Sequence, residues 1–127
     1  MKQLLIILIL VTTLQGRQQP HEVYGKWKLI KVETKNNILI PTKDFTLTIE
    51  ANRLHFNRDV NGCSATPILT DTTIDFYSEL CTRVCCDGQL DPIGGMDLYR
   101  GSYVATEKTL VISNGEVKTY LEKVNNK

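Results

Sequence analysis

The stretch 45-FTLTIEANRLHFNR-58 carries two runs in which apolar and polar residues alternate. A period of two places alternate side chains on opposite faces of a half-buried β-strand. The break at Ala51 and Asn52 is short, as in a tight turn between paired strands. The apolar face of this hairpin comprises Phe45, Leu47, Ile49, Leu54 and Phe56. The stretch therefore predicts two antiparallel strands that cover a core.

The same alternation recurs on both sides of this hairpin. Asn114-Gly115, between the last two predicted strands, is a strong turn signal because both residues tolerate positive φ. Further strands are predicted at residues 23–33, 64–69, 72–77, 102–106, 109–113 and 116–124. The pattern predicts a mainly β protein, a small antiparallel β-barrel or sandwich of about eight short strands with a disulfide-tethered loop.

The positions that the alternation assigns to the interior are bulky, with neither glycine nor alanine among them. The predicted inward residues are Trp27, Leu29, Phe45, Leu47, Ile49, Leu54, Phe56, Ile74, Phe76, Leu110, Ile112 and Leu121. Packed to the density of a protein interior, such side chains fill a small barrel. The sequence thus predicts a closed core without an enclosed lipid pocket.

The first residues, MKQLLIILILVTTLQG, have the layout of a secretory signal. Lys2 provides a basic start, residues 4–11 form an unbroken apolar run, and Gly16 is a small residue at the exit. The apolar run is about half the roughly 20 residues that a membrane-spanning helix needs. We expect residues 1–16 to be a signal peptide, no membrane span, and a secreted or extracytoplasmic protein.

The remaining residues, 17–127, have the length of a single domain. Without Lys2, basic and acidic residues number 14 each, and no basic cluster stands out. Binding to nucleic acid normally requires a basic face, so we expect no nucleic-acid partner.

Four cysteines, Cys63, Cys81, Cys85 and Cys86, are spaced as C-x17-C-x3-C-C. Structural zinc sites pair their ligands in closer motifs, and neither histidine of the chain completes one. A nucleophilic cysteine needs a base and an orienting partner, which no local motif supplies. We therefore expect no metal, no cofactor and two disulfides, the usual state of four cysteines in a small secreted domain.

The spacing narrows the disulfide connectivity. Adjacent cysteines have Cα atoms about 3.8 Å apart, closer than disulfides usually allow, so the pairing that joins Cys85 to Cys86 is set aside. Cys63–Cys86 with Cys81–Cys85 remains, as does Cys63–Cys85 with Cys81–Cys86, and we favour the first. Both would tie the 60-VNGC-63 strand end to the segment after residues 72–77.

Several segments follow one another in an order that resembles the META/HslJ-like domain family. They are 25-GKWKLIKVE-33, the pair 45-FTLTIE-50 and 53-RLHFNRDV-60, 61-NGCS-64, 72-TTIDFY-77, 82-TRVCC-86 and 109-TLVISNGEVKTYLEKV-124. The resemblance covers about residues 23 to 124. The positions that match the family's motifs, which include a Gly-Cys turn, are Trp27, Gly62, Cys63, Thr82, Arg83 and Cys86.

This resemblance implies an antiparallel barrel-like fold and a non-enzymatic role, often in secreted or envelope proteins. The chain departs from the family at Ser64, where Asn is usual, and in its additional Cys81 and Cys85. The segment 88-GQLDPIGGMDLYRG-101 replaces a helix of the family. The sequence also contains no G-x-S-x-G, phosphate-loop or H-E-x-x-H motif, so we expect no enzyme.

Two other functions are considered beside this one. Gly25-Lys26-Trp27 resembles the Gly-x-Trp opening of lipocalins, which would imply a carrier of a small hydrophobic ligand. A secreted inhibitor or adhesion module would instead bind a protein partner through a disulfide-held loop, since a rigid loop lowers the ordering cost of binding. The residues that this loop would offer are Ile93, Met96, Leu98 and Tyr99, and the alternative is that they cap the barrel.

Overall fold

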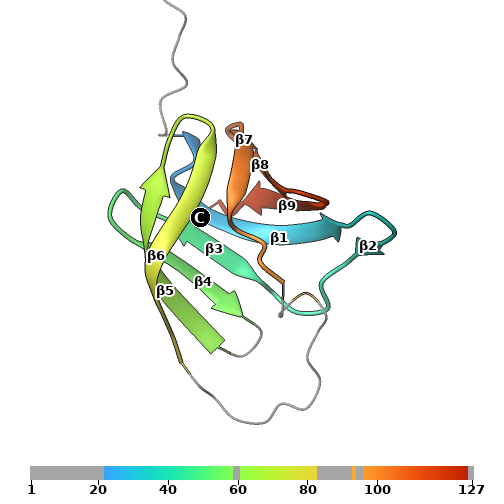
Figure 1. The fold of residues 1–127 in the computed structure, drawn as a ribbon, viewed down its shortest axis with the longest axis horizontal. Helices are drawn as coiled ribbons and strands as arrows, with labels where there is room; N and C mark the ends of the chain where they lie inside the picture. The colour runs from blue at the N-terminus through green and yellow to red at the C-terminus, as the bar shows by residue number, and fades with distance from the viewer. Residues whose placement is uncertain (1–21, 59–60, 83–92, 94–95, 126–127) are drawn as a thin grey trace, which may run out of the picture.

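The computed structural model describes residues 22–58, 61–82, 93 and 96–125, and these form one antiparallel sheet that closes into a barrel. Figure 1 shows the strands wrapped around a common interior. The strands are β1 (Gly25–Glu33), β2 (Ile38–Leu39), β3 (Thr46–Ile49), β4 (Leu54–Arg58), β5 (Asn61–Leu69), β6 (Thr73–Cys81), β7 (Gly101–Ala105), β8 (Thr109–Asn114) and β9 (Val117–Lys123). The predicted mainly β barrel is therefore confirmed.

Each strand of the barrel pairs with its neighbours in an order that closes on itself. The sheet runs β2-β1-β3-β4-β5-β6-β7-β8-β9, and a further pairing of β1 with β9 completes the ring. Eight strands thus form the barrel wall, and β2 extends the sheet beside β1. Closure leaves most strand edges paired, which is how small all-β proteins protect their backbone hydrogen-bonding groups.

The hairpin at residues 45–58 forms as its alternation predicts. Leu47 pairs with Phe56 and Ile49 with Leu54, and the Glu50 amide donates to the Arg53 carbonyl at 2.8 Å across the turn. The last hairpin turns one residue later than predicted, since Asn114 already pairs with Val117. The flexible backbone of Gly115, with a φ of 57°, supplies the turn.

All the predicted inward side chains lie in the barrel interior. Trp27, Leu47 and Leu110 are fully buried, and even the most accessible of the set, Phe76, is only 5% exposed. Further residues that the prediction left out of the core are Val23, Val32, Cys63, Ala65, Ile93, Leu98, Tyr99, Tyr103 and Ala105. The expectation that no alanine faces inward is wrong at Ala65 and Ala105, because alanine adds little to a hydrophobic pattern.

Three strands differ most from the prediction. β2 was not predicted, because its two residues are too few to show a period. β5 begins at Asn61, so 61-NGCS-64 is strand and not the turn that the family resemblance implies. β6 continues past Tyr77 to Cys81 through an irregularity at Ser78, whose φ is 55°.

Several predictions concern residues outside the described part of the chain. These are the signal peptide at residues 1–16, the start of the domain at residue 17, Arg83, Cys85 and Cys86. Among the residues that the structure does describe, no helix has the length and apolar character to cross a membrane.

Candidate functional site

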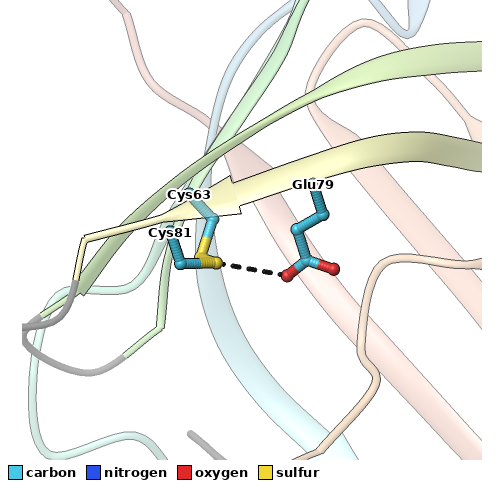
Figure 2. A group of neighbouring side chains, drawn as sticks. All are labelled: Cys63, Glu79 and Cys81. Atoms are coloured by element: carbon cyan, nitrogen blue, oxygen red, sulfur yellow. Dashed lines mark hydrogen bonds between the residues drawn. A yellow bond between two sulfur atoms is a disulfide. The ribbon is translucent and has the colours of Figure 1, made fainter.

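A disulfide joins Cys63 of β5 to Cys81 of β6, directly across the ladder (Figure 2). Both predicted connectivities, Cys63–Cys86 with Cys81–Cys85 and Cys63–Cys85 with Cys81–Cys86, are therefore wrong. The elimination failed because it set aside the pairing that joins Cys63 to Cys81, and because it treated Cys81 as part of a loop. In the fold, the bond links two neighbouring strands, and its two cysteines are 18 residues apart in the sequence. Closing a loop of this length is worth about 3 kcal/mol by the chain-entropy argument.

The strand register brings these two cysteines together. The Thr82 amide donates to the Gly62 carbonyl at 2.9 Å, which makes Cys63 and Cys81 a pair without hydrogen bonds between them. Such pairs have the closest Cα atoms in an antiparallel ladder, and here they lie 4.1 Å apart. The sulfurs can then meet without any movement of the strands.

A bulge in β6 turns Cys81 toward its partner. Ile74 and Phe76 face the core, so an unbroken period of two would turn residue 81 outward. Instead, Ser64 pairs with Leu80 and Thr66 pairs with Tyr77. β6 therefore advances by three residues where β5 advances by two, and it contains one extra residue. Such an insertion reverses the alternation. Leu80 is consequently 79% exposed, and Cys81 faces the buried Cys63.

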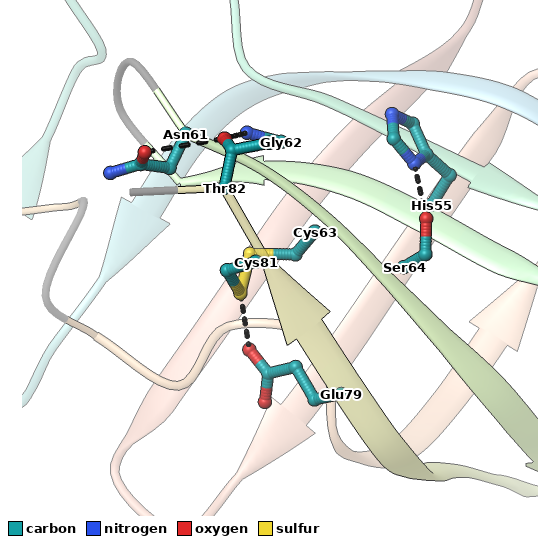
Figure 3. The surroundings of a disulfide bond; sticks show 8 residues. All are labelled: His55, Asn61, Gly62, Cys63, Ser64, Glu79, Cys81 and Thr82. Atoms are coloured by element: carbon teal, nitrogen blue, oxygen red, sulfur yellow. Dashed lines mark hydrogen bonds between the residues drawn. A yellow bond between two sulfur atoms is a disulfide. The ribbon is translucent and has the colours of Figure 1, made fainter. Parts of the chain in front are cut away.

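The two short motifs of the predicted family meet at this end of the barrel. The Gly62 amide donates to the Thr82 hydroxyl at 3.1 Å, and that hydroxyl donates to Asn61 Oδ1 at 3.3 Å (Figure 3). Gly62, Cys63 and Thr82 are therefore neighbours although the sequence separates them. Trp27, the other described motif residue, is buried in the core of the barrel.

Glu79 lies beside the disulfide and was not singled out in the sequence. Its Oε1 is 3.3 Å from Cys81 Sγ, and its side chain is half-buried. A disulfide sulfur carries no proton, so this contact becomes a hydrogen bond only when Cys81 is a thiol. Glu79 stands two residues before Cys81, and such residues share one face of a strand. Only the bulge turns that face toward Cys63.

The outer wall next to the disulfide carries a pair formed by His55 and Ser64. The two residues are cross-strand partners, with 3.0 Å between His55 Nδ1 and Ser64 Oγ (Figure 3). The His55 side chain is exposed on the outer face of β4. An open hollow of about 230 Å³ adjoins it, lined by Thr48, Glu50, Arg53 and His55. All four lining residues belong to a single hairpin and give little enclosure.

The four residues predicted to contact a partner from the loop pack into the barrel instead. Ile93 is 1% exposed, Leu98 and Tyr99 are 4% exposed, and Met96 is half-buried against the core. This plug, residues 93 and 96–99, leaves a cavity of about 10 Å³ next to Phe45, Phe56 and Phe76. Of the two roles considered for these residues, contact with a partner is therefore wrong and capping of the barrel is confirmed, because burying large apolar side chains is favourable wherever a barrel end is open.

Arg100 fastens the plug to β6. Its Nε donates to Asp75 Oδ1 at 3.0 Å, its Nη1 to Asp97 Oδ2 at 3.3 Å, and its Nη2 to the Phe76 carbonyl at 3.3 Å. The guanidinium also stacks 3.8 Å from the centre of the Phe76 ring. Partial burial acts to lower the pKa of Arg100, but Asp97 and Asp75 outweigh it and raise the pKa above its ordinary value. The network is a structural clamp.

The Gly25-Lys26-Trp27 segment serves the core. The Trp27 indole donates to the Val23 carbonyl at 2.8 Å, and the ring is fully buried. Lys123 lies over this ring and against Gly25, where a Cβ would come within 2.8 Å of the Lys123 Cε. These contacts account for the glycine and the tryptophan without a bound ligand.

Comparisons with known proteins support the fold alone. No protein-family model matches the chain, and no curated protein matches it. The chain is similar to a solved structure described as an NMR structure of a protein from Burkholderia xenovorans, with a TM-score of 0.60 and 16% identity. The match covers 84% of this chain and 88% of the other. At this identity, the two proteins share an architecture, and a shared architecture does not imply a shared function.

Proposed function

We propose that this chain is a secreted, non-enzymatic barrel protein of the META/HslJ-like type that acts through its outer surface. The disulfide between Cys63 and Cys81 supports secretion, since such bonds persist in oxidising compartments. The META/HslJ-like assignment rests on the order of the sequence segments and on the meeting of Gly62, Cys63 and Thr82 at one end of the barrel.

The observation that carries this proposal is the filling of the barrel interior. Bulky side chains from both halves of the sheet are buried in one cluster, and the plug inserts Ile93, Leu98 and Tyr99 into it. The cavity beneath the plug has a volume of about 10 Å³. A cavity of that size holds about one water molecule, whereas a carrier needs hundreds of Å³ for its ligand.

The test is a ligand titration of the purified protein. A fluorescent fatty acid and a retinoid, added separately, should produce no saturable quenching of Trp27, the only tryptophan of the chain. Saturable binding of about one ligand per chain would reject the filled interior and favour the alternative, a lipocalin-like carrier of a small hydrophobic ligand.

A specific surface favours the second alternative, a secreted inhibitor or adhesion module. Ile68, Tyr77 and Leu80 lie on the outer face of β5 and β6 and are 49%, 55% and 79% exposed. The strands that carry them are joined by the disulfide, so little ordering would accompany binding. We therefore place the contact with an apolar protein surface on this face and not on the loop after Cys81.

A matched pair of variants tests this surface. Tyr77→Ser combined with Leu80→Ser should abolish capture of a partner from the extracellular medium in which the protein occurs. Val104→Ser on β7, where the valine is 65% exposed, should leave that capture intact. Equal capture by both variants would reject the surface.

A further inference from the structure

Two sulfur atoms and a carboxylate oxygen come together at the end of β5 and β6. The ligand atoms of Cys63, Glu79 and Cys81 all lie within 4.8 Å of one another (Figure 2). They do so through the cross-strand register and the bulge of β6, and not through a local C-x2-C motif. Sequence spacing could not have indicated this group, since 17 residues separate the two cysteines.

We propose that Cys63, Cys81 and Glu79 form a redox-gated zinc site, closed while the disulfide is intact and able to hold one Zn²⁺ once it is reduced. Two thiolates and a carboxylate are ligands that Zn²⁺ accepts, and a water molecule would complete the tetrahedron. Harder cations such as Mg²⁺ and Ca²⁺ prefer oxygen ligands and are not expected here.

The gating reaction balances with a dithiol as the reductant. The dithiol transfers two electrons and two protons to the Cys63–Cys81 bond and becomes a disulfide itself. The protein then carries two thiols, and the Cys81 thiol can donate to Glu79 Oε1, which already lies 3.3 Å away. Binding of Zn²⁺ displaces both thiol protons, so zinc binding and disulfide formation exclude each other.

The surrounding ladder would hold the ligands in place after reduction. The Thr82 amide and the Gly62 carbonyl keep the strands paired next to the cysteines, and the Thr82 hydroxyl ties back to the Gly62 amide. Two sulfurs on a tetrahedral zinc lie roughly 3.8 Å apart, given Zn–S bonds of about 2.3 Å. Side-chain rotation can supply that separation between facing residues of one ladder.

Burial favours the metal over two free thiolates. Cys63 is fully buried, and an unpaired anion there would be costly to desolvate. A divalent cation compensates this charge, and the half-buried Glu79 and exposed Cys81 leave a path for the ion to enter. The site therefore combines a buried anchor with an accessible side.

The experiment uses the full chain with Cys85→Ser and Cys86→Ser, so that Cys63 and Cys81 are its only thiols. The protein is reduced with a phosphine, which takes up the oxygen of one water while the hydrogens of that water pass to the sulfurs, and the reagent is then removed. Cd²⁺, a spectroscopic substitute for Zn²⁺, should produce a thiolate charge-transfer band that saturates at one ion per chain. Zn²⁺ should abolish this band, and the oxidised protein should give no band.

Glu79 is tested against a matched surface acid. In the same background, Glu79→Gln should weaken Cd²⁺ binding by about 100-fold or more, because the loss of a direct ligand costs at least as much as the loss of an outer-shell partner, which costs about 10- to 100-fold. Glu107→Gln, in the turn between β7 and β8, should bind as the parent does. Equal affinity of these two variants, or no band in the reduced parent, would overturn the site.

The proposal can also be tested if reduction of the disulfide unfolds the protein. If reduction shifts the Trp27 emission to that of the unfolded chain, one equivalent of Cd²⁺ should restore the native emission, because the metal binds the folded arrangement. Failure of Cd²⁺ to restore the emission would reject the proposal.

Discussion

The barrel is closed differently between β1 and β9 and between β6 and β7. Between β1 and β9 a ladder of six residue pairs runs from Trp27–Lys123 to Glu33–Lys118. Between β6 and β7 only Thr73–Ser102 and Ile74–Gly101 are paired. β7 begins at Gly101, and beyond these pairs Arg100, next to the plug, binds Asp75 and the Phe76 carbonyl of β6.

The contrast shows that backbone and side chains can substitute for each other in closing a barrel. On the ladder side, strand pairing satisfies the backbone groups, and the core side chains lie behind it. On the plug side, Thr119 Oγ1 of β9 donates to the Leu98 carbonyl at 2.8 Å, and Arg100 binds the Phe76 carbonyl of β6. Closure there depends on two backbone pairs, on Arg100 of the connecting segment and on Thr119 of β9.

The largest expected effect comes from removing the tryptophan at the ladder closure. Trp27→Ala should lower the free energy of unfolding by about 3–5 kcal/mol, the range for deleting a fully buried large aromatic side chain. Urea unfolding followed by far-ultraviolet circular dichroism measures the change, since the fluorophore itself is lost. Lys26→Ala, at the neighbouring exposed position, should cost no more than about 0.5 kcal/mol. A similar loss in both variants would contradict a core role for Trp27.

A smaller effect is expected where the plug enters β7. Gly101 has a φ of 137°, and a Cβ there would collide with the Ser113 carbonyl of β8. Gly101→Ala should therefore cost about 3 kcal/mol, from a strained backbone and a displaced strand. Gly115→Ala, at a φ of 57° with open space around it, should cost about 1 kcal/mol.

Hydrogen exchange can localise this difference. Gly101→Ala should expose the Tyr103 amide, which donates to the Thr72 carbonyl, while the β1–β9 amides keep their protection. Uniform loss of protection around the barrel would show that the two closures are not independent.

The smallest effect concerns an ion pair at the rim of the ladder closure. Glu33 accepts from Lys31 Nζ at 3.1 Å and from the Tyr120 hydroxyl at 3.0 Å, and these partners lower the pKa of its carboxyl below the ordinary 4.5. A lowered folded-state pKa stabilises the fold above pH 4.5, and this contribution is lost as the pH falls through the folded-state pKa. Wild type should thus be more stable than Glu33→Gln at neutral pH, and the difference should shrink in acid. A difference in unfolding midpoint that does not vary with pH would contradict this assignment.

The strands were predictable where the alternation is long and unbroken. In β3, β4 and β8 the inward residues follow from the sequence, because a one-residue slip would expose every apolar side chain at once. The plug was only partly predictable. Its large apolar residues indicated a contact, but the sequence did not distinguish burial in the barrel from binding to a partner.

The disulfide region was the least predictable part of the candidate site. Counting alternate residues from Phe76 would turn Leu80 inward, yet it is 79% exposed. The single extra residue near Ser78 reverses the alternation, and no turn motif or glycine marks its position. A prediction of cysteine pairing therefore depended on a register that local sequence does not encode.

The sequence by itself determined the all-β architecture, the apolar faces of β3, β4 and β8, and the turns at Ala51-Asn52 and near Gly115. These depend on the period of two and on backbone preferences, which act between residues close in the chain. Only the tertiary structure decided that the sheet closes, that Cys63 faces Cys81 with Glu79 beside them, and that the plug fills the barrel end. The physical reason is that these features require register and burial across residues distant in sequence, where many pairings satisfy the same local pattern.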